Sequence, residues 1–433
     1  MSSAAPGGFG RETQSSVYRA GISGTKPAVP TMSDALEERA RRTMSTEAFA
    51  YIAGGAGGES TVAANRAAFD DWQIWPRPLR DVSQRDLSTD FFGRVRRTPF
   101  LLAPLGVMEL AHADADRAVA HAAAALGVPY VLSSQASFSM EVVAAAAPQG
   151  ERWFQLYWSA SDALNESLLR RAGESGCTAI VITVDTHILG WRTRDLDLAY
   201  LPFTRGLGLA QYTSDPVFRA IVEERAREPR EEGPSVRVTP QAVAAGLSIA
   251  RTGRAITGTG LRDSLRSPLP RLAIETFLDV FSTPTLTWDD LARARSWTHL
   301  PIIVKGIVHP GDAEAALAAG ADGIWISNHG GRQIDRSVPT LAVLPEIAER
   351  VGTRAPIIFD SGIRGGADAA VALALGATSV AIGRPYAYGL GIAGERGVHE
   401  VIRNHIAELD ITLGLAGHTA VRELSPDSLR RVR

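Results

Sequence analysis

The chain has 433 residues, of which 45% are hydrophobic, and a formal net charge of −2. This length suits one large α/β domain with insertions, and the near-neutral charge excludes the electrostatic footprint of a protein that binds nucleic acid or an anionic membrane. Cys177 is the single cysteine, so an intrachain disulfide is excluded, and neither a signal-peptide core nor a run of about 20 apolar residues occurs. We therefore expect a cytoplasmic protein without a membrane anchor.

The first 98 residues show no recurring pattern. A polar leader is followed by two stretches of helical character, 33–44 and the glycine-rich 50–60. We expect residues 1–98 to form an irregular leader and a helical cap, in front of a domain that spans residues 99–433.

From residue 99 onward, short apolar runs alternate with alanine-rich helical stretches that close on glycines such as Gly127, Gly320 and Gly376. The runs are 99–106, 129–134, 152–157, 178–185, 301–306, 323–331, 356–362 and 379–385. Strands that are apolar on both faces and alternate with helices form parallel sheets. Units of this number predict a closed (β/α)₈ TIM barrel, with an open doubly wound sheet as the alternative.

The alternation is interrupted once, after Asp185. We expect residues 193–286 to form an insertion, whose charged middle from Glu223 to Arg237 belongs at the surface. Its last part is a helix with one apolar face, formed by Ile274, Phe277, Leu278 and Phe281. An insertion at this point emerges on the catalytic face of a barrel, which favours a lid. A surface decoration or an oligomer contact is the alternative.

Lysine is almost absent from this chain, which has only Lys26 and Lys305. Lys26 lies in the polar leader, whereas Lys305 ends the apolar run 301–306. A buried ammonium group needs a partner. Lys305 is therefore predicted to have a functional role.

Polar and ionisable residues follow the expected strands, where barrel enzymes carry their catalytic groups. In chain order these residues are Gln155, Tyr157, Thr183, Asp185, Lys305, Ser327, His329, Arg332, Asp360, Arg364, Gly383 and Arg384. A single aspartate in such a place commonly caps the next helix. So many polar residues on one rim indicate an active site instead.

Two motifs on this rim carry chemistry. After the last two strands, glycines let the backbone approach an anion, and Arg364 and Arg384 can neutralise its charge. This pattern predicts a phosphate site. The glycines are Gly362, Gly365, Gly366 and Gly383.

The segment 327–335 combines His329, which is suited to proton removal near neutral pH, with Arg332, which is suited to binding a carboxylate through two hydrogen bonds. A lone histidine is usually structural, but Arg332 and Arg192 beside it favour a base that faces an anionic substrate.

These residues resemble those of the FMN-dependent 2-hydroxy-acid oxidases and dehydrogenases, from about residue 33 to the C-terminus. The matching stretches include YIAGGAG, APLGV, TVDT, GWRTRDL, SNHGGRQ and DSGIRGGAD, and the lactate 2-monooxygenase subgroup is the most similar. The resemblance implies that His329 removes the α-proton or the hydroxyl proton, and that Asp185 stabilises the resulting imidazolium. It also implies that Arg192, Arg332 and Tyr51 bind the substrate carboxylate and that Tyr157 bonds the hydroxyl or the developing carbonyl.

The same resemblance implies a site for FMN. Lys305 would stabilise the reduced ring, and Ser133, Gln155 and Thr183 would bond it. The ribityl phosphate would be held by Asp360, Gly362, Arg364, Gly383 and Arg384, and the flavin site would also include Ala103, Pro104, Leu105, Gly106 and Ser327. The implied partners are a small L-2-hydroxy acid such as lactate, molecular oxygen and further copies of the chain, as a tetramer or octamer. No metal, nucleic acid or membrane partner is expected.

Two positions depart from parts of the family. Gln135 stands where some plant-type members have tryptophan after the Ser-Ser pair, so the pocket wall differs. Gly106 stands where oxidases and dehydrogenases commonly have alanine. We predict that the missing methyl opens space beside the flavin, so that the keto acid stays bound and is decarboxylated by peroxide. A glycine that only lets the strand end turn is the alternative.

Several other functions remain as alternatives. An inosinate-dehydrogenase-like barrel would need a cysteine nucleophile on a loop, whereas Cys177 begins an expected strand at the wrong end. A flavin-binding protein without chemistry would not need His329, Arg332 and Arg192. Within the family, an oxidase that releases peroxide and a dehydrogenase with another acceptor both stay open, but the charged insertion does not suit a membrane anchor.

Overall fold

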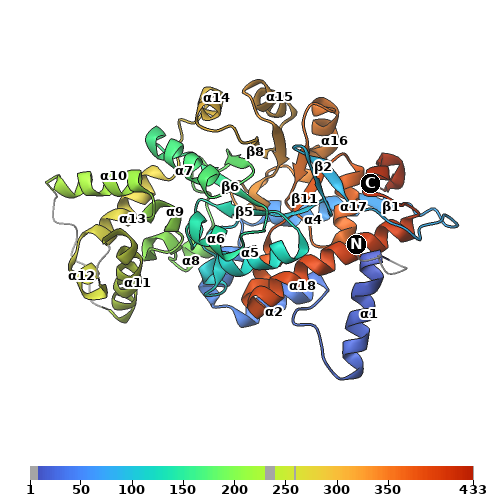
Figure 1. Ribbon diagram of the computed structural model, residues 1–433, viewed down its shortest axis with the longest axis horizontal. Coiled ribbons are helices and arrows are strands. Elements are labelled where there is room, and N and C mark those ends of the chain that lie inside the picture. Colours follow the sequence, from blue (N-terminus) through green and yellow to red (C-terminus); the bar gives the residue numbers. More distant parts are fainter. Residues whose placement is uncertain (1–7, 230–238, 258–259, 433) are drawn as a thin grey trace.

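Eight short parallel strands close into a barrel at the centre of the molecule (Figure 1). The computed structural model describes residues 8–229, 239–257 and 260–432. Around the barrel the strand order is β10-β11-β4-β5-β6-β7-β8-β9, with the bounds Phe100–Leu102 for β4, Tyr130–Ser133 for β5, Arg152–Tyr157 for β6, Ile180–Thr183 for β7, Ile302–Ile307 for β8, Gly323–Ile326 for β9, Ile357–Phe359 for β10 and Ser379–Ile382 for β11. These strands coincide with the predicted runs, so the predicted barrel is confirmed and the open sheet is excluded.

A ring of helices follows the strands in turn. These helices are α5 (Ala115–Leu126), α6 (Met140–Ala146), α7 (Asp162–Glu174), α14 (Trp288–Trp297), α15 (Pro310–Ala318), α16 (Thr340–Val351), α17 (Gly366–Ala374) and α18 (Arg384–Ala416). Gly127, Gly320 and Gly376 end three of them with φ values of +65°, +93° and +109°. Glycine enters this region without steric cost, so the predicted helix ends are confirmed.

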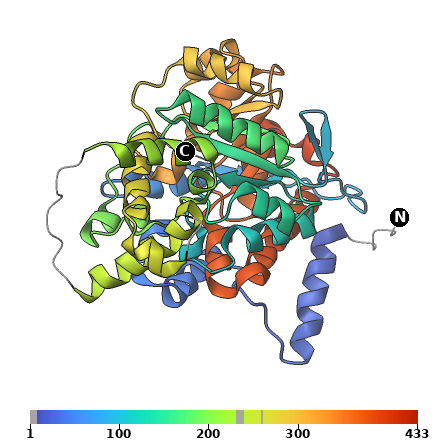
Figure 2. The same cartoon turned by 60° about the vertical axis from the view of Figure 1, so that its left-hand side comes forward.

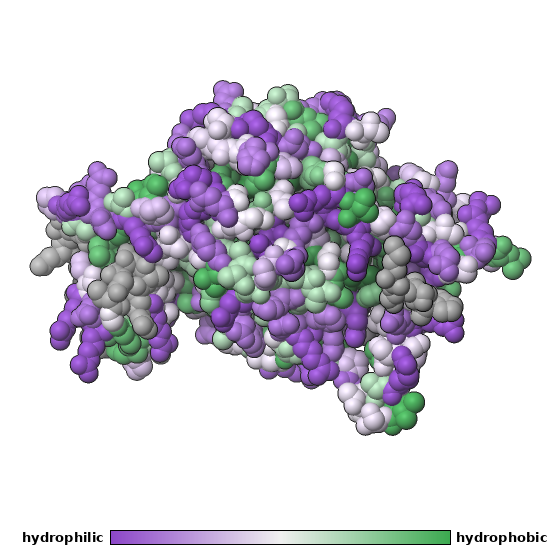
Figure 3. All heavy atoms as spheres, in the orientation of Figure 1, coloured by the Kyte–Doolittle hydropathy of each residue, from purple (hydrophilic) through white to green (hydrophobic). Residues whose placement is uncertain are grey.

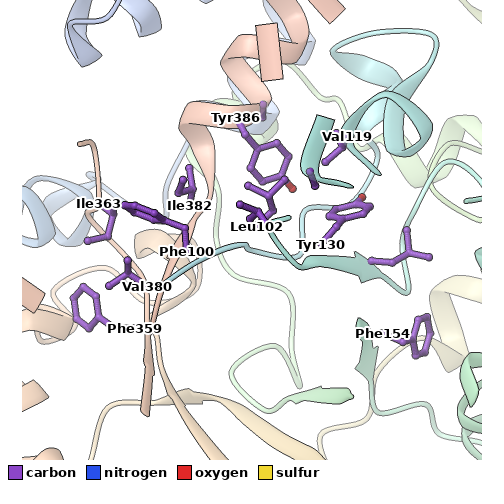
Figure 4. Close-up of a cluster of buried hydrophobic side chains, with 14 of the residues drawn as sticks. Phe100, Leu102, Val119, Tyr130, Phe154, Phe359, Ile363, Val380, Ile382 and Tyr386 are labelled. Carbon is purple, nitrogen blue, oxygen red and sulfur yellow. The ribbon is translucent and has the colours of Figure 1, made fainter. Parts of the chain in front are cut away.

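The barrel strands are apolar on both faces because each face packs against a different core. Phe100, Leu102 and Tyr130 point outward and pack with helical residues such as Val119 and Tyr386 (Figure 4). The alternate residues fill the barrel interior: Leu101, Val131, Trp153, Val181, Ile303, Trp325, Ile358 and Ala381. The hairpin of β2 (Thr89–Phe91) and β3 (Arg94–Arg96) closes the N-terminal end of the barrel, where Phe91 and Phe92 pack on Trp153.

Helices before the barrel form a cap that reaches the catalytic rim. They are α2 (Ser33–Thr43), α3 (Thr46–Ala53) and α4 (Ser60–Ala67), followed by the short 3₁₀ helix η1 (Ala68–Asp71). Strand β1 (Trp72–Ile74) then pairs antiparallel with the C-terminal strand β12 (Leu429–Arg431). Further 3₁₀ turns lie at Met108–Leu110 (η2), His329–Gly331 (η4), Val421–Glu423 (η5) and Pro426–Ser428 (η6).

The prediction of an irregular leader was wrong for Gly8–Ile22, which form helix α1. The cause is tertiary: the amide of Gly10 donates to the Asp410 carboxylate of α18 over 2.7 Å, and Asp410 also receives Arg85. The far end of α1 projects from the body of the molecule (Figure 1), and hydrophobic and hydrophilic residues are mixed at its tip (Figure 3). Ile22, its last residue, is 88% exposed.

The insertion between β7 and β8 is mainly helical. It contains α8 (Thr193–Asp197), η3 (Pro202–Arg205), α9 (Ala210–Thr213), α10 (Pro216–Arg227), α11 (Pro240–Thr257), α12 (Leu261–Arg266) and α13 (Leu269–Val280). Helices α10 to α13 gather at one end of the molecule, which comes forward in Figure 2. The predicted apolar face is confirmed, since Ile274, Phe277 and Phe281 are buried, and Phe277 packs on Phe203, Tyr212 and Phe281.

Part of the predicted charged stretch, residues 230–238, lies outside the described residues. Its first residues, from Glu223 to Arg227, belong to α10. Whether the insertion acts as a lid or contacts other copies stays a prediction. Within the described parts of the chain, no helix is both long enough and apolar enough to span a bilayer.

We predict that Asp410→Ala destabilises the protein strongly. The variant leaves the Arg85 guanidinium buried without its carboxylate, since the two side chains are only 9% and 3% exposed, and it uncaps α1 at Gly10. Breaking such a pair typically costs about 3–5 kcal/mol of unfolding free energy. Glu174→Ala is the control, because it removes an exposed pair with Arg170 that contributes about 0–1 kcal/mol. Denaturant unfolding measures both variants, and equal losses would contradict the prediction.

Candidate active site

A cavity with about 860 Å³ of empty space opens at the C-terminal ends of the barrel strands. Its lining contains most of the predicted site residues, namely Tyr51, Ala103, Pro104, Leu105, Gly106, Tyr157, Arg192, Lys305, His329, Arg332, Asp360, Gly362, Arg364, Gly383 and Arg384. Sequence reasoning did not place Ile52, Met108, Gly330, Ser361, Ile363 and Ala381 there, although each of them is next to or near a predicted residue. No described residue of 193–286 lines the cavity.

The floor of this cavity follows from strand geometry. Side chains alternate along a strand, so the residue two places beyond an inward one also faces inward. The interior residues named above therefore lead, one layer further along each strand, to Ala103, Ser133, Gln155, Thr183, Lys305, Ser327, Asp360 and Gly383. The pairing of strands aligns Ser133 with Gln155, and Tyr157 with Thr183 and Lys305. These residues thus face the barrel interior at the C-terminal ends of the strands, and we call them the top layer.

His329 is held by the loop that follows β9. Its amide donates to Ser327 Oγ over 3.0 Å, and its backbone adopts a left-handed φ of +56°. The Asn328 side chain accepts from the amide of Gly331, which tightens the turn. His329 Nδ1 lies 2.8 Å from Asp185 Oδ1, and Nε2 lies 3.4 Å from the Tyr157 hydroxyl. The imidazole therefore has a carboxylate on one side and a phenol on the other.

The surroundings of His329 favour a neutral imidazole next to an ionised Asp185 carboxylate. Burial lowers the pKa of His329 below its usual 6.5, and Lys305 lowers that pKa further, although Asp185 raises it. Burial alone would raise the pKa of Asp185, but His329 and Lys305 lower it to about 2. The ionised carboxylate only accepts hydrogen bonds, so Nδ1 of the neutral imidazole carries the proton and Nε2 is left as an acceptor.

Lys305 is buried beneath His329, with a side chain that is 4% exposed. Its Nζ donates to Ser327 Oγ over 3.0 Å and lies 4.0 Å from Asp185 Oδ2 and 3.8 Å from Asp360 Oδ2. Asp360 is fixed in turn by Trp325 Nε1 and Ser361 Oγ. The lone barrel lysine is therefore the cation of a buried network with two carboxylates.

Two arginines bind the N-terminal cap to the rim of the cavity. Arg332 donates to the carbonyl oxygens of Tyr51 and Gly54 over 2.5 and 2.8 Å, and Arg384 donates to those of Ile52 and Gly54. These oxygens belong to the end of α3 or follow it, where helix carbonyls lack partners and cations are favoured. Burial, together with Arg192 and Arg384, lowers the pKa of Arg332 to about 9. A bound anion would relieve this concentration of positive charge.

The predicted phosphate site is only partly as expected. Gly365 and Gly366 were predicted to approach the anion, but Glu408 occupies that place: it accepts from the amide of Gly366 over 2.8 Å, and a Cβ on Gly365 would lie 2.5 Å from its Oε2. This prediction was wrong because α18 supplies the capping carboxylate. Gly362, Arg364, Gly383 and Arg384 remain on the cavity wall, and Arg384 together with burial lowers the pKa of Arg364.

The donor set fits a flavin mononucleotide. Gln155 Nε2 and Thr183 Oγ1 are buried in the top layer without a hydrogen-bond partner, and such groups are costly unless a ligand or water satisfies them. A Cβ on Gly383 would meet only Ala103 Cβ, at 4.0 Å, so this strand end leaves room for a ligand. Arginines at one end of the cavity supply the charge that a phosphate needs. In the part of the chain that is described, no cluster of His, Cys, Asp and Glu suits a metal ion.

Besides Gly365 and Gly366, five predicted residues do not line this cavity. Ser133, Gln155 and Thr183 lie in the layer at its floor. Ser327 ends the same layer, but Ser327 and Asp185 line a neighbouring cavity and contact His329 and Lys305. Sequence reasoning also missed Thr186, whose hydroxyl donates to Asp185 Oδ1, and Gln333, which donates to the Asp185 carbonyl. Both residues lie within the stretches TVDT and SNHGGRQ, so their position beside predicted residues was the only available signal.

Gly106 does not open the space that was predicted beside it. The place of its missing methyl is not open, because a Cβ there would lie 2.8 Å from Gln135 Cβ and 3.1 Å from the Gln135 carbonyl oxygen. Gly106 does not have the positive φ that would require glycine for the turn either. It is a close-approach glycine, and Gln135 fills the space beside it.

Comparison with known proteins gives a consistent result. The model of the FMN-dependent dehydrogenase family matches residues 40–431. An FMN-dependent alpha-hydroxy acid dehydrogenase of Penicillium citrinum is 38% identical over 97% of this chain and 95% of its own length. An L-lactate oxidase of Lysinibacillus sphaericus is 38% identical over 90% of each chain. The crystal structure of a mandelate oxidase with (S)-4-hydroxymandelic acid superposes with a TM-score of 0.74, at 33% identity, over 93% of this chain and 98% of that one.

We predict that His329 titrates below pH 6.5, which NMR of its ring nitrogens can measure. Burial disfavours the imidazolium, so the ring gains its proton only as the pH falls below the usual value. Two variants should move the midpoint in opposite directions: Asp185→Asn lowers it, because a raising charge is lost, and Lys305→Met raises it, because a lowering charge is lost. A midpoint above 6.5, or shifts of the same sign, would contradict this account.

Proposed function

The chain belongs to the FMN-dependent dehydrogenase family and is an FMN-dependent 2-hydroxy-acid oxidoreductase, and we propose that it oxidises a lactate-like L-2-hydroxy acid with molecular oxygen as the electron acceptor. One observation carries the proposal. Nε2 of a neutral His329, oriented by the ionised Asp185, faces a cavity that Tyr157, Arg192 and Arg332 also line. A base beside two guanidinium groups suits an acid with a hydroxyl next to its carboxylate.

When FMN is bound, its ring would accept the two electrons of the substrate, and oxygen would then take them from the ring. We propose that Gln155 and Thr183, whose free donors lie in the top layer, bond its ring together with Ser133. Lys305 would neutralise charge at the ring. Gly362, Arg364, Gly383 and Arg384 would hold the phosphate, whereas the carboxylate of Asp360, next to Lys305, suits a ribityl hydroxyl better than a phosphate because two anions repel.

The remaining residues handle the substrate. Arg192 and Arg332 would bind its carboxylate, with Tyr51 beside Arg332, whose guanidinium lies 5.1 Å from the Tyr51 ring. Burial raises the pKa of Tyr157, so its phenol stays protonated and can donate to the substrate oxygen. His329 would take a proton at Nε2, from the hydroxyl or from the α-carbon, and Asp185 would stabilise the imidazolium. The substrate loses two electrons and two protons to become the 2-keto acid.

We extend the proposal to oxidative decarboxylation, as in lactate 2-monooxygenase. The keto acid keeps the carboxylate that Arg192 and Arg332 would hold, so it can remain in the cavity while oxygen is reduced. Hydrogen peroxide formed there converts the keto acid to the shortened acid, CO₂ and water. The second candidate is an oxidase that releases both products. Two observations favour it: several relatives are named oxidases, and Gln135 fills the space that Gly106 was expected to open.

The proposed base gives a direct test. His329→Gln should retain bound FMN but slow anaerobic flavin reduction by about 10²–10⁴, the usual cost of removing a general base. Arg332→Met should also weaken the binding of oxalate, because it removes a carboxylate partner. Released flavin, analysed after denaturation, verifies that each variant carries FMN. Near-normal reduction in the His329 variant would remove this residue from the role of base.

Product analysis in air distinguishes the proposed reactions. With L-lactate or the best substrate found, we expect the shortened acid and CO₂ with little free peroxide. Stoichiometric keto acid and peroxide would instead establish the simple oxidase. Slow reaction with oxygen but fast reaction with a quinone would establish a dehydrogenase and overturn the role of oxygen.

A further inference from the structure

Gln135 offers the cavity a side-chain amide that no other described residue binds. The residue follows β5, is only 7% exposed and lines the cavity. Its backbone is fully occupied, since its amide donates to Ser133 Oγ over 3.0 Å and its carbonyl accepts from the amide of Val107 over 2.8 Å. Its side-chain amide has no hydrogen bond to any described residue. The amide therefore has a free donor group and a free acceptor that can hydrogen-bond a ligand in the cavity.

The position of Gln135 is set by two glycines. A Cβ on Gly106 would lie 2.8 Å from Gln135 Cβ, and a Cβ on Gly208 would lie 3.0 Å from its carbonyl oxygen. Gly208 belongs to the insertion after β7 and has a φ of +73°. Since both close contacts involve the backbone or Cβ of Gln135, neither can be relieved by rotating the end of its side chain. The backbone and Cβ of Gln135 are therefore fixed beside the cavity.

Its place on the wall matches the part of the substrate that has no other partner. His329 and Tyr157 face the hydroxyl side, and Arg192 and Arg332 face the carboxylate. The flavin would occupy the side of the top strand layer. Gln135, together with Leu105 and Met108 from the loop after β4, forms the wall that remains. With the other groups of the substrate so placed, the substituent on the α-carbon would face this wall.

We propose that Gln135 is a specificity-determining residue that selects 2-hydroxy acids with a neutral hydrogen-bonding group, such as a hydroxyl, on C3 or C4. The amide presents one donor group and one acceptor, so a hydroxyl that both accepts and donates is its complement. A methyl or phenyl substituent would leave the amide unpaired. A second carboxylate could accept from Gln135 Nε2 but would leave Oε1 without a donor. This inference rests on the proposed function, because it assumes that the cavity binds a 2-hydroxy acid.

The test compares substrates that differ by one hydroxyl. Anaerobic flavin reduction is measured with L-glycerate against L-lactate, and with (S)-2,4-dihydroxybutyrate against (S)-2-hydroxybutyrate. In the native holoenzyme we expect kcat/KM to favour at least one hydroxylated acid by about tenfold or more, since sites built to hydrogen-bond a hydroxyl reject analogues that lack it. Gln135→Met keeps the size of the side chain but not its hydrogen bonds, and should reduce that ratio to about one. Gln73→Met makes the same change at an exposed glutamine of β1, outside the cavity, and should leave the ratio unchanged.

The outcomes separate this inference from the proposed function. If no 2-hydroxy acid reduces the flavin, the proposed function itself fails. If flavin is reduced but the native ratios favour lactate and 2-hydroxybutyrate, the inference is overturned, whatever the variant does. The inference also fails if Gln135→Met leaves the ratio unchanged, or if it shifts the flavin absorbance spectrum while the ratio is retained, because Gln135 would then contact the ring rather than the substrate. If the variant does not bind FMN, the native ratios alone decide.

Discussion

The candidate site depends on one buried carboxylate, Asp185, which lies between an imidazole and an ammonium group. An unpaired charge in this interior would be strongly destabilising, and each of the three groups reduces that cost for the others. Lys305 keeps Asp185 ionised, and Asp185 in turn orients the imidazole of His329 and sets its tautomer. Ser327 joins the two ends, because its hydroxyl accepts from both Lys305 Nζ and the His329 amide. A change at any one of these residues therefore alters the protonation state or the orientation of the others.

A second constraint connects the N-terminal cap to this network. Arg332 and Arg384 use their guanidinium groups on carbonyl oxygens at the end of α3, so the cap is part of the cavity wall rather than an accessory. The same arginines carry the positive charge that would attract carboxylate and phosphate. Folding of residues 46–54 and the anion preference of the cavity consequently depend on the same side chains.

The close approach of Gly106 and Gln135 shapes one wall of the cavity. The absence of a methyl group at Gly106 does not create space, because the Cβ and the carbonyl oxygen of Gln135 already occupy that place. The functional consequence of the glycine is then the placement of an amide in the cavity. Gly106, which follows β4, and Gln135, which follows β5, would thus affect both the choice of substrate substituent and the reaction with oxygen.

Much of this protein follows from its sequence alone. The alternation of short apolar runs with alanine-rich helices that end on glycines predicts the barrel, and the polar residues at the strand ends predict the site, because both patterns are local in the chain. The interactions that define the site are not local. Asp410 turns a leader into helix α1, Glu408 takes the amide that a phosphate was expected to use, and Gln135 fills the space beside Gly106. Each depends on residues that are distant in sequence and on the packing of whole elements, which only the tertiary structure decides.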